Sequence, residues 1–170
     1  IGRQTKDGRM VEWLDYRSDT ARISDDVVAP AWLGLAIIAQ LNETGETSWL
    51  KKSISWFDGG ASSVHEHLIR SAEHCLRQCD SGQLVTSGDG VSTEKTGLVA
   101  LFLKELLPIL EHERDHQLVR KYQLAYERMK ESVSRRLWDG SYYLAERNGK
   151  KVGSRKNPHR KIDLAAQVWP

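Results

Sequence analysis

Residues 27–41 read VVAPAWLGLAIIAQL, and this apolar stretch decides the fold. Apolar side chains fall on nearly every side at helical spacing, which predicts a helix buried between layers, with Pro30 tolerated in its first turn. Pro30, Gly34 and Gln40 interrupt the run, so it falls short of the roughly 18 uninterrupted apolar residues typical of a membrane span. The stretch therefore predicts a helical fold with no membrane span, in which this helix has neighbours on several sides.

Helical periodicity continues on the C-terminal side of this stretch. Ser63-Val64-His65-Glu66 matches a capping box, so it predicts the start of a helix. Asp115 is placed to cap another helix, and Pro108 is expected to bend or stop the helix before it. Beyond residues 27–41, the expected helices cover Thr47–Trp56, Val64–Cys79, about Thr93–Pro108, Asp115–Leu137 and a segment from about Lys161.

One β-hairpin is expected near the C-terminus. Asn148-Gly149 is a strong signal for a type I′ turn, and Tyr142–Ala145 and Lys151–Val152 flank it as strands. Asp80–Gly90 is expected to be a Gly- and Ser-rich loop with one extended piece at Gln83–Thr86. About six helices and one hairpin make the predicted fold class mostly α.

The composition excludes several classes of protein. The chain has 170 residues with 25 basic and 23 acidic side chains, a mixture typical of one folded domain and not of a disordered tail. A formal net charge of +2 indicates no strongly charged partner. A basic run surrounds the hairpin, but without interleaved aromatic side chains it predicts a solvated face and no nucleic-acid partner. The run comprises Arg147, Lys150, Lys151, Arg155, Lys156, Arg160 and Lys161.

Cysteine and histidine side chains suggest a metal site, but their spacing argues against one. His65 and His67 face apart on a helix, while Cys75 and Cys79 fall on its apolar stripe beside His74. Two cysteines cannot form a disulfide framework, so we expect buried reduced thiols, no metal and a cytoplasmic location. Most of the six tryptophans are expected in the core, with one or two available to stack on a sugar.

Several segments, taken in order, resemble glycoside hydrolase family 94, the inverting phosphorylases of β-glucosides. That family includes cellobiose phosphorylase, chitobiose phosphorylase and the phosphorylase-like part of cyclic β-1,2-glucan synthases. The similarity runs in order from about Asp19 to Trp169. The segments that carry it are Ser24-Asp25-Asp26 with Trp32-Leu33, Glu43-Thr44-Gly45-Glu46, Phe57-Asp58-Gly59-Gly60, Val64-His65-Glu66-His67, Trp138-Asp139-Gly140-Ser141-Tyr142-Tyr143-Leu144, Val152-Gly153-Ser154 and Lys161-Ile162-Asp163-Leu164-Ala165-Ala166-Gln167-Val168-Trp169.

The resemblance implies that residues 1–170 are part of a single (α/α)6 catalytic barrel, with no complete second domain. The missing initiator methionine likewise indicates a chain cut from something longer. The rest of the parent barrel would then be a partner of this chain. The family's phosphate-binding segments lie beyond Trp169, so the chain alone is expected to be inactive. The oligomeric state does not follow from the sequence.

The family's general acid is the second Asp of Gly-Asp-Trp-Asn-Asp-Gly-Met, and this chain has a shorter stretch, Ser87-Gly88-Asp89-Gly90-Val91. Asp89 corresponds either to that acid or to the first, non-catalytic Asp of the motif. Inverting phosphorolysis needs one acid alone, because phosphate is already an anionic nucleophile. The alternative is that Asp89 is a turn residue, since Gly-Asp-Gly is ordinary turn chemistry.

By the same resemblance, Asp25 and Asp26 would hold hydroxyl groups of the non-reducing-end sugar, together with Arg22 or Arg17. Carboxylates suit this role because each sugar hydroxyl is a hydrogen-bond donor. The alternative is capping, because two acids before an apolar helix complement its dipole. The two roles are compatible.

The predicted function is phosphorolysis of a β-linked glucoside to α-glucose 1-phosphate, with inorganic phosphate as cosubstrate, and neither a metal nor another cofactor. The partners are then a β-glucoside oligosaccharide and phosphate. One alternative is a non-catalytic carbohydrate-binding or scaffold remnant of the barrel. A third hypothesis is a free-standing helical interaction module.

Overall fold

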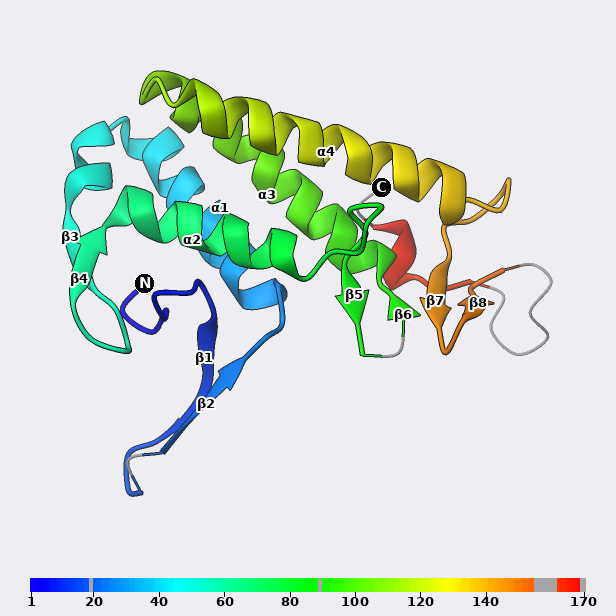
Figure 1. Ribbon diagram of the computed structural model, residues 1–170, viewed down its shortest axis with the longest axis horizontal. Coiled ribbons are helices and arrows are strands. Elements are labelled where there is room, and N and C mark those ends of the chain that lie inside the picture. Colours follow the sequence, from blue (N-terminus) through cyan, green and yellow to red (C-terminus); the bar gives the residue numbers. More distant parts are fainter. Residues whose placement is uncertain (19, 89, 155–161, 169–170) are drawn as a thin grey trace. The chain divides into compact units, whose positions relative to one another are not determined.

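The computed structural model describes residues 1–18, 20–88, 90–154 and 162–168. It divides into two compact units, Ile1–Arg77 and Gln78–Pro170. Four α-helices dominate the described residues, with two short 3-10 helices and eight short strands in three sheets (Figure 1). The mostly helical fold class is therefore confirmed, although the described residues contain four α-helices where about six were expected.

In the first unit, α1 (Val28–Thr44) packs against α2 (Val64–Arg77). The helix expected at 27–41 is confirmed and runs further, to Thr44; Gly45 caps it, and its backbone N–H donates to the Leu41 carbonyl at 2.8 Å. Its burial differs from the expectation: Ile37 and Ile38 are buried, whereas Trp32 is 49% exposed. One face of α1 is thus buried within this chain and the other is open.

The expected helix at Thr47–Trp56 is wrong beyond its first half. A 3-10 helix, η1 (Thr47–Lys51), is followed by strand β3 (Ser53–Ser55), which pairs antiparallel with β4 (Ala61–Ser63). Ser53-Ile54-Ser55 alternates polar and apolar side chains with period two, and this favours a strand. The Ser63 hydroxyl then accepts the Glu66 backbone N–H at 3.1 Å, so the capping interaction predicted at the start of α2 is confirmed.

A second hairpin in this unit was not predicted. Strand β1 (Met10–Asp15) pairs antiparallel with β2 (Thr20–Ser24), and a bulge lies between Val11 and Trp13. The hairpin projects away from α1 and α2 (Figure 1). Because β2 ends at Ser24 and α1 begins at Val28, residues 22–26 lie just before the start of α1.

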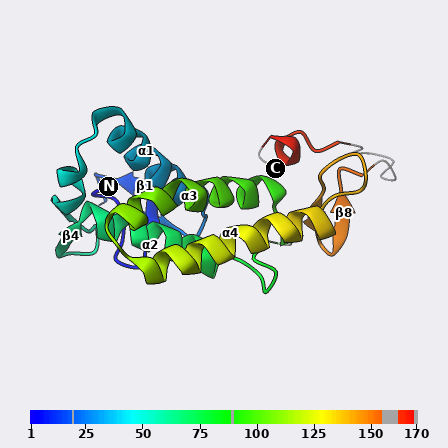
Figure 2. The ribbon, with the colours of Figure 1, turned by 90° about the horizontal axis from the view of Figure 1, so that it is seen from above.

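In the second unit, α3 (Thr93–His112) and α4 (His116–Arg136) lie side by side (Figures 1 and 2). The Asp115 carboxylate accepts the Leu118 N–H at 3.1 Å, which confirms the predicted cap of α4. Pro108 does not stop α3, which continues to His112. Leu106 and Leu110 on either side of it are fully buried, and their packing outweighs the helix-breaking tendency of proline.

A four-stranded antiparallel sheet closes one end of this unit. Its order is β5 (Thr86–Ser87), β6 (Gly90–Val91), β7 (Ala145–Arg147) and β8 (Lys150–Val152). Asn148 and Gly149 have φ of 50° and 67°, as a type I′ turn requires, so the predicted turn is confirmed. The first strand of the hairpin is Ala145–Arg147, not Tyr142–Ala145 as expected. The sheet also includes part of the expected loop at Asp80–Gly90.

Two helix boundaries and one side-chain prediction need correction. Helix α2 ends at Arg77, because Cys79 instead bridges Val85 in the approach to β5. After Lys161, which lies outside the described residues, the structure has only the 3-10 helix η2 (Ala165–Gln167). Of the five described tryptophans, Trp56 alone is buried. Placing most of the tryptophans in the core was therefore wrong.

No described helix combines the length and the apolar character needed to cross a membrane.

Candidate functional site

The two acids predicted to bind sugar lie at the entry to α1. The Asp26 carboxylate accepts the Val28 N–H, at the first residue of α1, at 2.8 Å, while Val27 at the N-cap position has no side-chain cap. Asp25 is different: its side chain is 74% exposed, and one oxygen lies 3.3 Å from Nη1 of Arg9. Asp25 is thus held by a cation and remains accessible to a hydroxyl donor.

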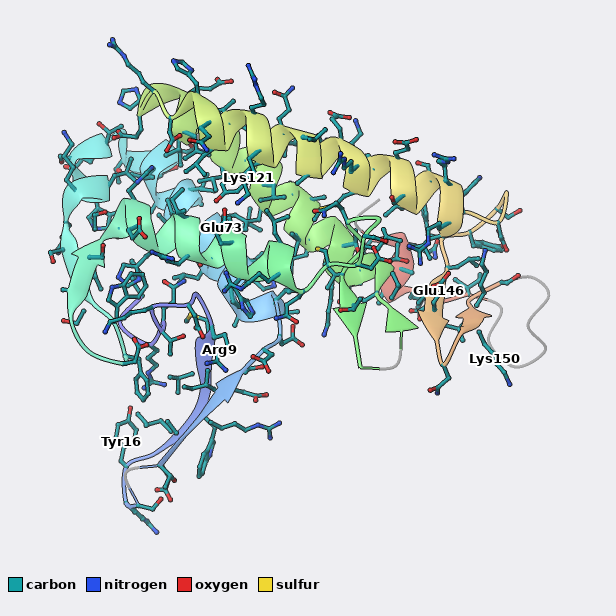
Figure 3. The ribbon with its side chains drawn as sticks, viewed as in Figure 1. Arg9, Tyr16, Glu73, Lys121, Glu146 and Lys150 are labelled. Atoms are coloured by element: carbon teal, nitrogen blue, oxygen red, sulfur yellow. The ribbon has the colours of Figure 1, made fainter. Side chains whose placement is uncertain are left out.

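The arginine at this carboxylate is not the one expected. Arg22 lies across the hairpin from Trp13 and pairs with Glu12 at 3.2 Å. Arg9, labelled in Figure 3, instead pairs with both Asp25 and Asp7. Nothing local in the sequence connects Arg9 with Asp25, which lies 16 residues further along. The hairpin between them brings the two together.

The charges of Arg9 and its carboxylate partners shift pKa values in this cluster. Burial raises the pKa of Asp7, but hydrogen bonds from the Thr5 hydroxyl and the Arg9 backbone, with the Arg9 charge, outweigh it and lower the pKa overall. The carboxylates of Asp7 and Asp25 raise the pKa of Arg9 in turn. Asp7 and Arg9 therefore stay ionised at neutral pH, and charged groups bind sugar hydroxyls more strongly than neutral ones do.

Helix α2 anchors the backbone of the same segment. Nε2 of His74 donates to the Asp25 carbonyl at 3.1 Å, and the Cys75 thiol lies 3.8 Å from the Val27 carbonyl. Both side chains are buried. The position of Asp25 is thus set by α2 as well as by the hairpin.

The β1–β2 hairpin also presents two exposed aromatic side chains. Trp13, within β1, is 55% exposed, and Tyr16, near the far end of the hairpin (Figure 3), is 76% exposed. The Arg3 guanidinium donates to the Tyr16 hydroxyl at 2.6 Å. An exposed indole beside the Arg22–Glu12 pair can stack on the C–H face of a sugar while the ions bind its hydroxyls.

The candidate acid, Asp89, lies outside the described residues, but its neighbours are described. Ser87 pairs with Gly90 and Thr86 pairs with Val91, so the strands on either side of residue 89 are hydrogen-bonded to each other. The Ser92 N–H then donates to the Val85 carbonyl at 3.0 Å, and the Thr93 hydroxyl donates to the Leu144 carbonyl. This short β-hairpin thus leads directly into the N-terminus of α3.

The C-terminal segments that carry the family resemblance converge beside this sheet. The Asp139 carboxylate accepts the N–H groups of Ser141 and Tyr142 at 2.9 and 2.8 Å. The Gln167 amide accepts the Tyr143 N–H at 3.0 Å and donates to its carbonyl at 2.7 Å. Motifs 24 residues apart therefore form one substructure.

Of the histidines in the rejected metal site, His67 and His74 have other hydrogen-bond partners, whereas Nε2 of His65 is buried without one in the part of the chain that the structure describes. His67 is buried with Nδ1 2.7 Å from the Gln4 side-chain oxygen and Nε2 3.2 Å from the Ile54 carbonyl. Among the described residues, no three His, Cys, Asp or Glu side chains lie close enough to hold a metal ion together.

Neither cysteine is in a disulfide; Cys75 is buried as expected, whereas Cys79 is only partly buried, so that part of the prediction was wrong. Burial, with the nearby charge of Asp80, raises the pKa of Cys79 to about 12, so its thiol stays protonated and is a poor nucleophile at neutral pH. A cytoplasmic location stays a prediction.

The family model of the glycosyl hydrolase 94 superfamily catalytic domain matches residues 4–170, fifteen residues further toward the N-terminus than the resemblance found in the sequence. The chain is 33% identical to solabiose phosphorylase of Paenibacillus borealis, with 98% of this chain and 23% of that protein covered. It is 26% identical to N,N'-diacetylchitobiose phosphorylase of Vibrio furnissii, covering 81% of this chain and 19% of that protein.

A further relative is the cyclic beta-(1,2)-glucan synthase NdvB of Rhizobium meliloti, 25% identical over 98% of this chain and 7% of that protein. The chain thus spans less than a quarter of the length of each of these relatives. The segment 4–18 is part of the family match; it contains Arg9, which was not predicted as a site residue, and Arg17, which was offered as a sugar ligand. On the match over residues 4–170, the chain belongs to the glycosyl hydrolase 94 superfamily, within its catalytic domain.

Proposed function

We propose that the full-length protein carrying this chain cleaves a β-linked glucoside with inorganic phosphate and releases α-glucose 1-phosphate. The family match over residues 4–170 carries the proposal, because the relatives reported above include two disaccharide phosphorylases. Barrel segments outside this chain would supply the phosphate site. Together with this chain they would complete one (α/α)6 barrel.

The proposed chemistry needs one proton donor. A phosphate oxygen attacks the anomeric carbon while the bond from that carbon to the glycosidic oxygen breaks. The carboxylic acid of Asp89 gives its proton to the departing oxygen and is left as a carboxylate. Attack from the opposite face inverts the anomeric centre, so a β-glucoside gives the α-phosphate.

In this proposal Asp25, Asp26 and Arg22 bind the non-reducing-end sugar. The exposed Asp25 carboxylate supports its part, since one side of it is held by Arg9 at 3.3 Å while most of the side chain faces solvent. Asp26 would combine two roles, accepting the first N–H of α1 and binding a hydroxyl. Helix starts favour such sites, because the backbone there is rigid and the local field complements a carboxylate.

The test is Asp89→Asn in the full-length protein, assayed for α-glucose 1-phosphate release from a panel of β-glucobioses with phosphate. Loss of the proton donor should reduce the rate by about 10²–10⁴-fold. Asp115→Asn is the matched control, because asparagine also caps helices well and α4 should stay intact. If Asp89→Asn keeps near-normal activity, residue 89 is a turn residue.

One observation favours the alternative of a non-catalytic carbohydrate-binding remnant. Ser87 pairs directly with Gly90, so only Gly88 and Asp89 join the strands where the family motif is longer. Titration calorimetry separates the two: a wild-type protein that binds glucobioses and releases no sugar phosphate in any assay is the remnant.

A further inference from the structure

An ionic cluster outside the residues discussed so far connects both sides of the hairpin that carries residue 89. Nη1 of Arg136, in the last turn of α4, lies 2.6 Å from an Asp80 carboxylate oxygen. Nη2 of the same guanidinium lies 3.3 Å from a Glu146 carboxylate oxygen. We call these three residues, Asp80, Arg136 and Glu146, the Arg136 clamp.

One arm of the clamp shapes the chain before residue 89. The other Asp80 carboxylate oxygen accepts the N–H groups of Gly82 and Leu84 at 2.8 and 2.9 Å, and the Asp80 N–H donates to the Leu84 carbonyl at 2.9 Å. Asp80 therefore closes the turn that leads into β5. Leu84 is fully buried beside Val91, Val133 and Leu137, so this turn is anchored in the core.

The other arm holds the chain after residue 89. Glu146 lies on β7, where it pairs with Val91 of β6, and Arg147 next to it pairs with Gly90 (Figure 3). Gly90 directly follows residue 89 in the sequence. Lys151 of β8 adds a bond from its ammonium to the Arg136 carbonyl at 3.0 Å, so α4 contacts the sheet at two strands.

The geometry points to Arg136 as a positioning residue that fixes the hairpin of Asp89 for proton transfer to the glycosidic oxygen. This inference rests on the proposed function, in which Asp89 is the acid. A planar guanidinium with two parallel donors can bind two carboxylates at once, whereas a lysine ammonium lacks that fork. Burial raises the pKa of Asp80, but the Leu84 N–H bond and the hydrogen bond and charge of Arg136 outweigh it and lower the pKa, so the Asp80 carboxylate remains charged at working pH.

Misplacing a catalytic group by about 1 Å costs on the order of 10²-fold in rate. Arg136→Gln should therefore lower kcat for a β-glucobiose by about that factor and leave KM nearly unchanged, because no proposed sugar ligand is altered. Dinitrophenyl β-glucoside is the diagnostic substrate, since its leaving group needs no proton. With this substrate, Arg136→Gln should lower kcat by less than about tenfold. A residue that only stabilises the fold would affect both substrates equally.

The matched control is Arg135→Gln, on the same turn of α4. Arg135 is 75% exposed and pairs with Glu131 at 2.8 Å, away from the sheet, so its loss should change neither substrate's kinetics. Arg136→Lys and Glu146→Gln are the second variants. Each keeps part of the clamp, so each should lower kcat by a smaller factor with the same dependence on the leaving group. These variants keep the test decisive if Arg136→Gln does not fold.

The experiment uses the full-length protein, with Asp89→Asn measured alongside. If Asp89→Asn is inactive while all the clamp variants have the same kcat values as Arg135→Gln, the positioning role of Arg136 is refuted and the assignment of Asp89 as the acid stands. If Asp89→Asn is active, the assignment of Asp89 as the acid is wrong, and the proposed positioning role of Arg136 is wrong as well. Equal losses on both substrates would make Arg136 a purely structural residue and refute its positioning role.

Discussion

Gly8 shows how a single residue determines the packing of the first unit. Its φ is 90°, and a Cβ at this position would lie 2.0 Å from the Arg70 carbonyl oxygen of α2. The N-terminal segment therefore approaches the helix backbone more closely than any side chain allows. Gly45 also has a positive φ, 68°, but its Cβ would meet nothing within 4 Å.

The two glycines allow a matched prediction. Gly45→Ala should lower the free energy of unfolding by about 1–2 kcal/mol, the cost of a left-handed conformation alone. Gly8→Ala should cost more than about 3 kcal/mol, because a backbone atom must also move. Urea unfolding monitored by circular dichroism measures both. Equal losses for the two variants would mean that the N-terminal segment does not pack on α2 as described.

At the scale of elements, His74 connects α2 with the entry to α1. Burial lowers the pKa of His74, although its hydrogen bond to the Asp25 carbonyl opposes this. Above the ordinary value of 6.5 the imidazole is neutral in both the folded and unfolded chain. Below it the unfolded chain takes up the proton first, so the folded state loses stability as the pH falls. His67, whose pKa is also lowered by burial, acts in the same direction.

We therefore expect the free energy of unfolding to decrease between about pH 7 and pH 5, the range in which histidine titrates. His74→Gln should weaken this dependence, because position 74 then has no imidazole to titrate, while His67 keeps its own contribution. His116→Gln, at an exposed position, should keep the wild-type slope. Urea titrations at a series of pH values measure the slopes. A wild-type stability that rises toward pH 5 contradicts the prediction.

The elements also differ in how well the sequence predicted them. The capped helices α2 and α4 begin where Ser63 and Asp115 indicated, because a cap satisfies N–H groups locally. Pro108 was expected to bend or stop its helix, and the stop was wrong because burial of Leu106 and Leu110 is a tertiary effect. Ser53–Ser55 is a strand only because Ala61–Ser63 returns to pair with it.

At the scale of the whole molecule, the proposed reaction predicts its stereochemistry. A single displacement by phosphate should give the α-anomer of glucose 1-phosphate from a β-glucoside, because the nucleophile enters opposite the leaving group. Proton NMR of the first product formed by the full-length protein distinguishes the anomers through the coupling of the anomeric proton. The β-phosphate as first product would instead indicate a double displacement through a covalent intermediate.

The sequence by itself determined the family and the helical class, because apolar periodicity, caps and the Asn148-Gly149 turn are local properties read along the chain. It also indicated Asp25, Asp26 and Asp89 as residues to examine. Tertiary structure alone decided the pairing of Arg9 with Asp25 and the connection of Asp80 with Glu146 through Arg136. These contacts join residues 16, 56 and 10 positions apart, and no local pattern encodes them. They exist because chain reversals bring opposite charges together at distances where their attraction is strong.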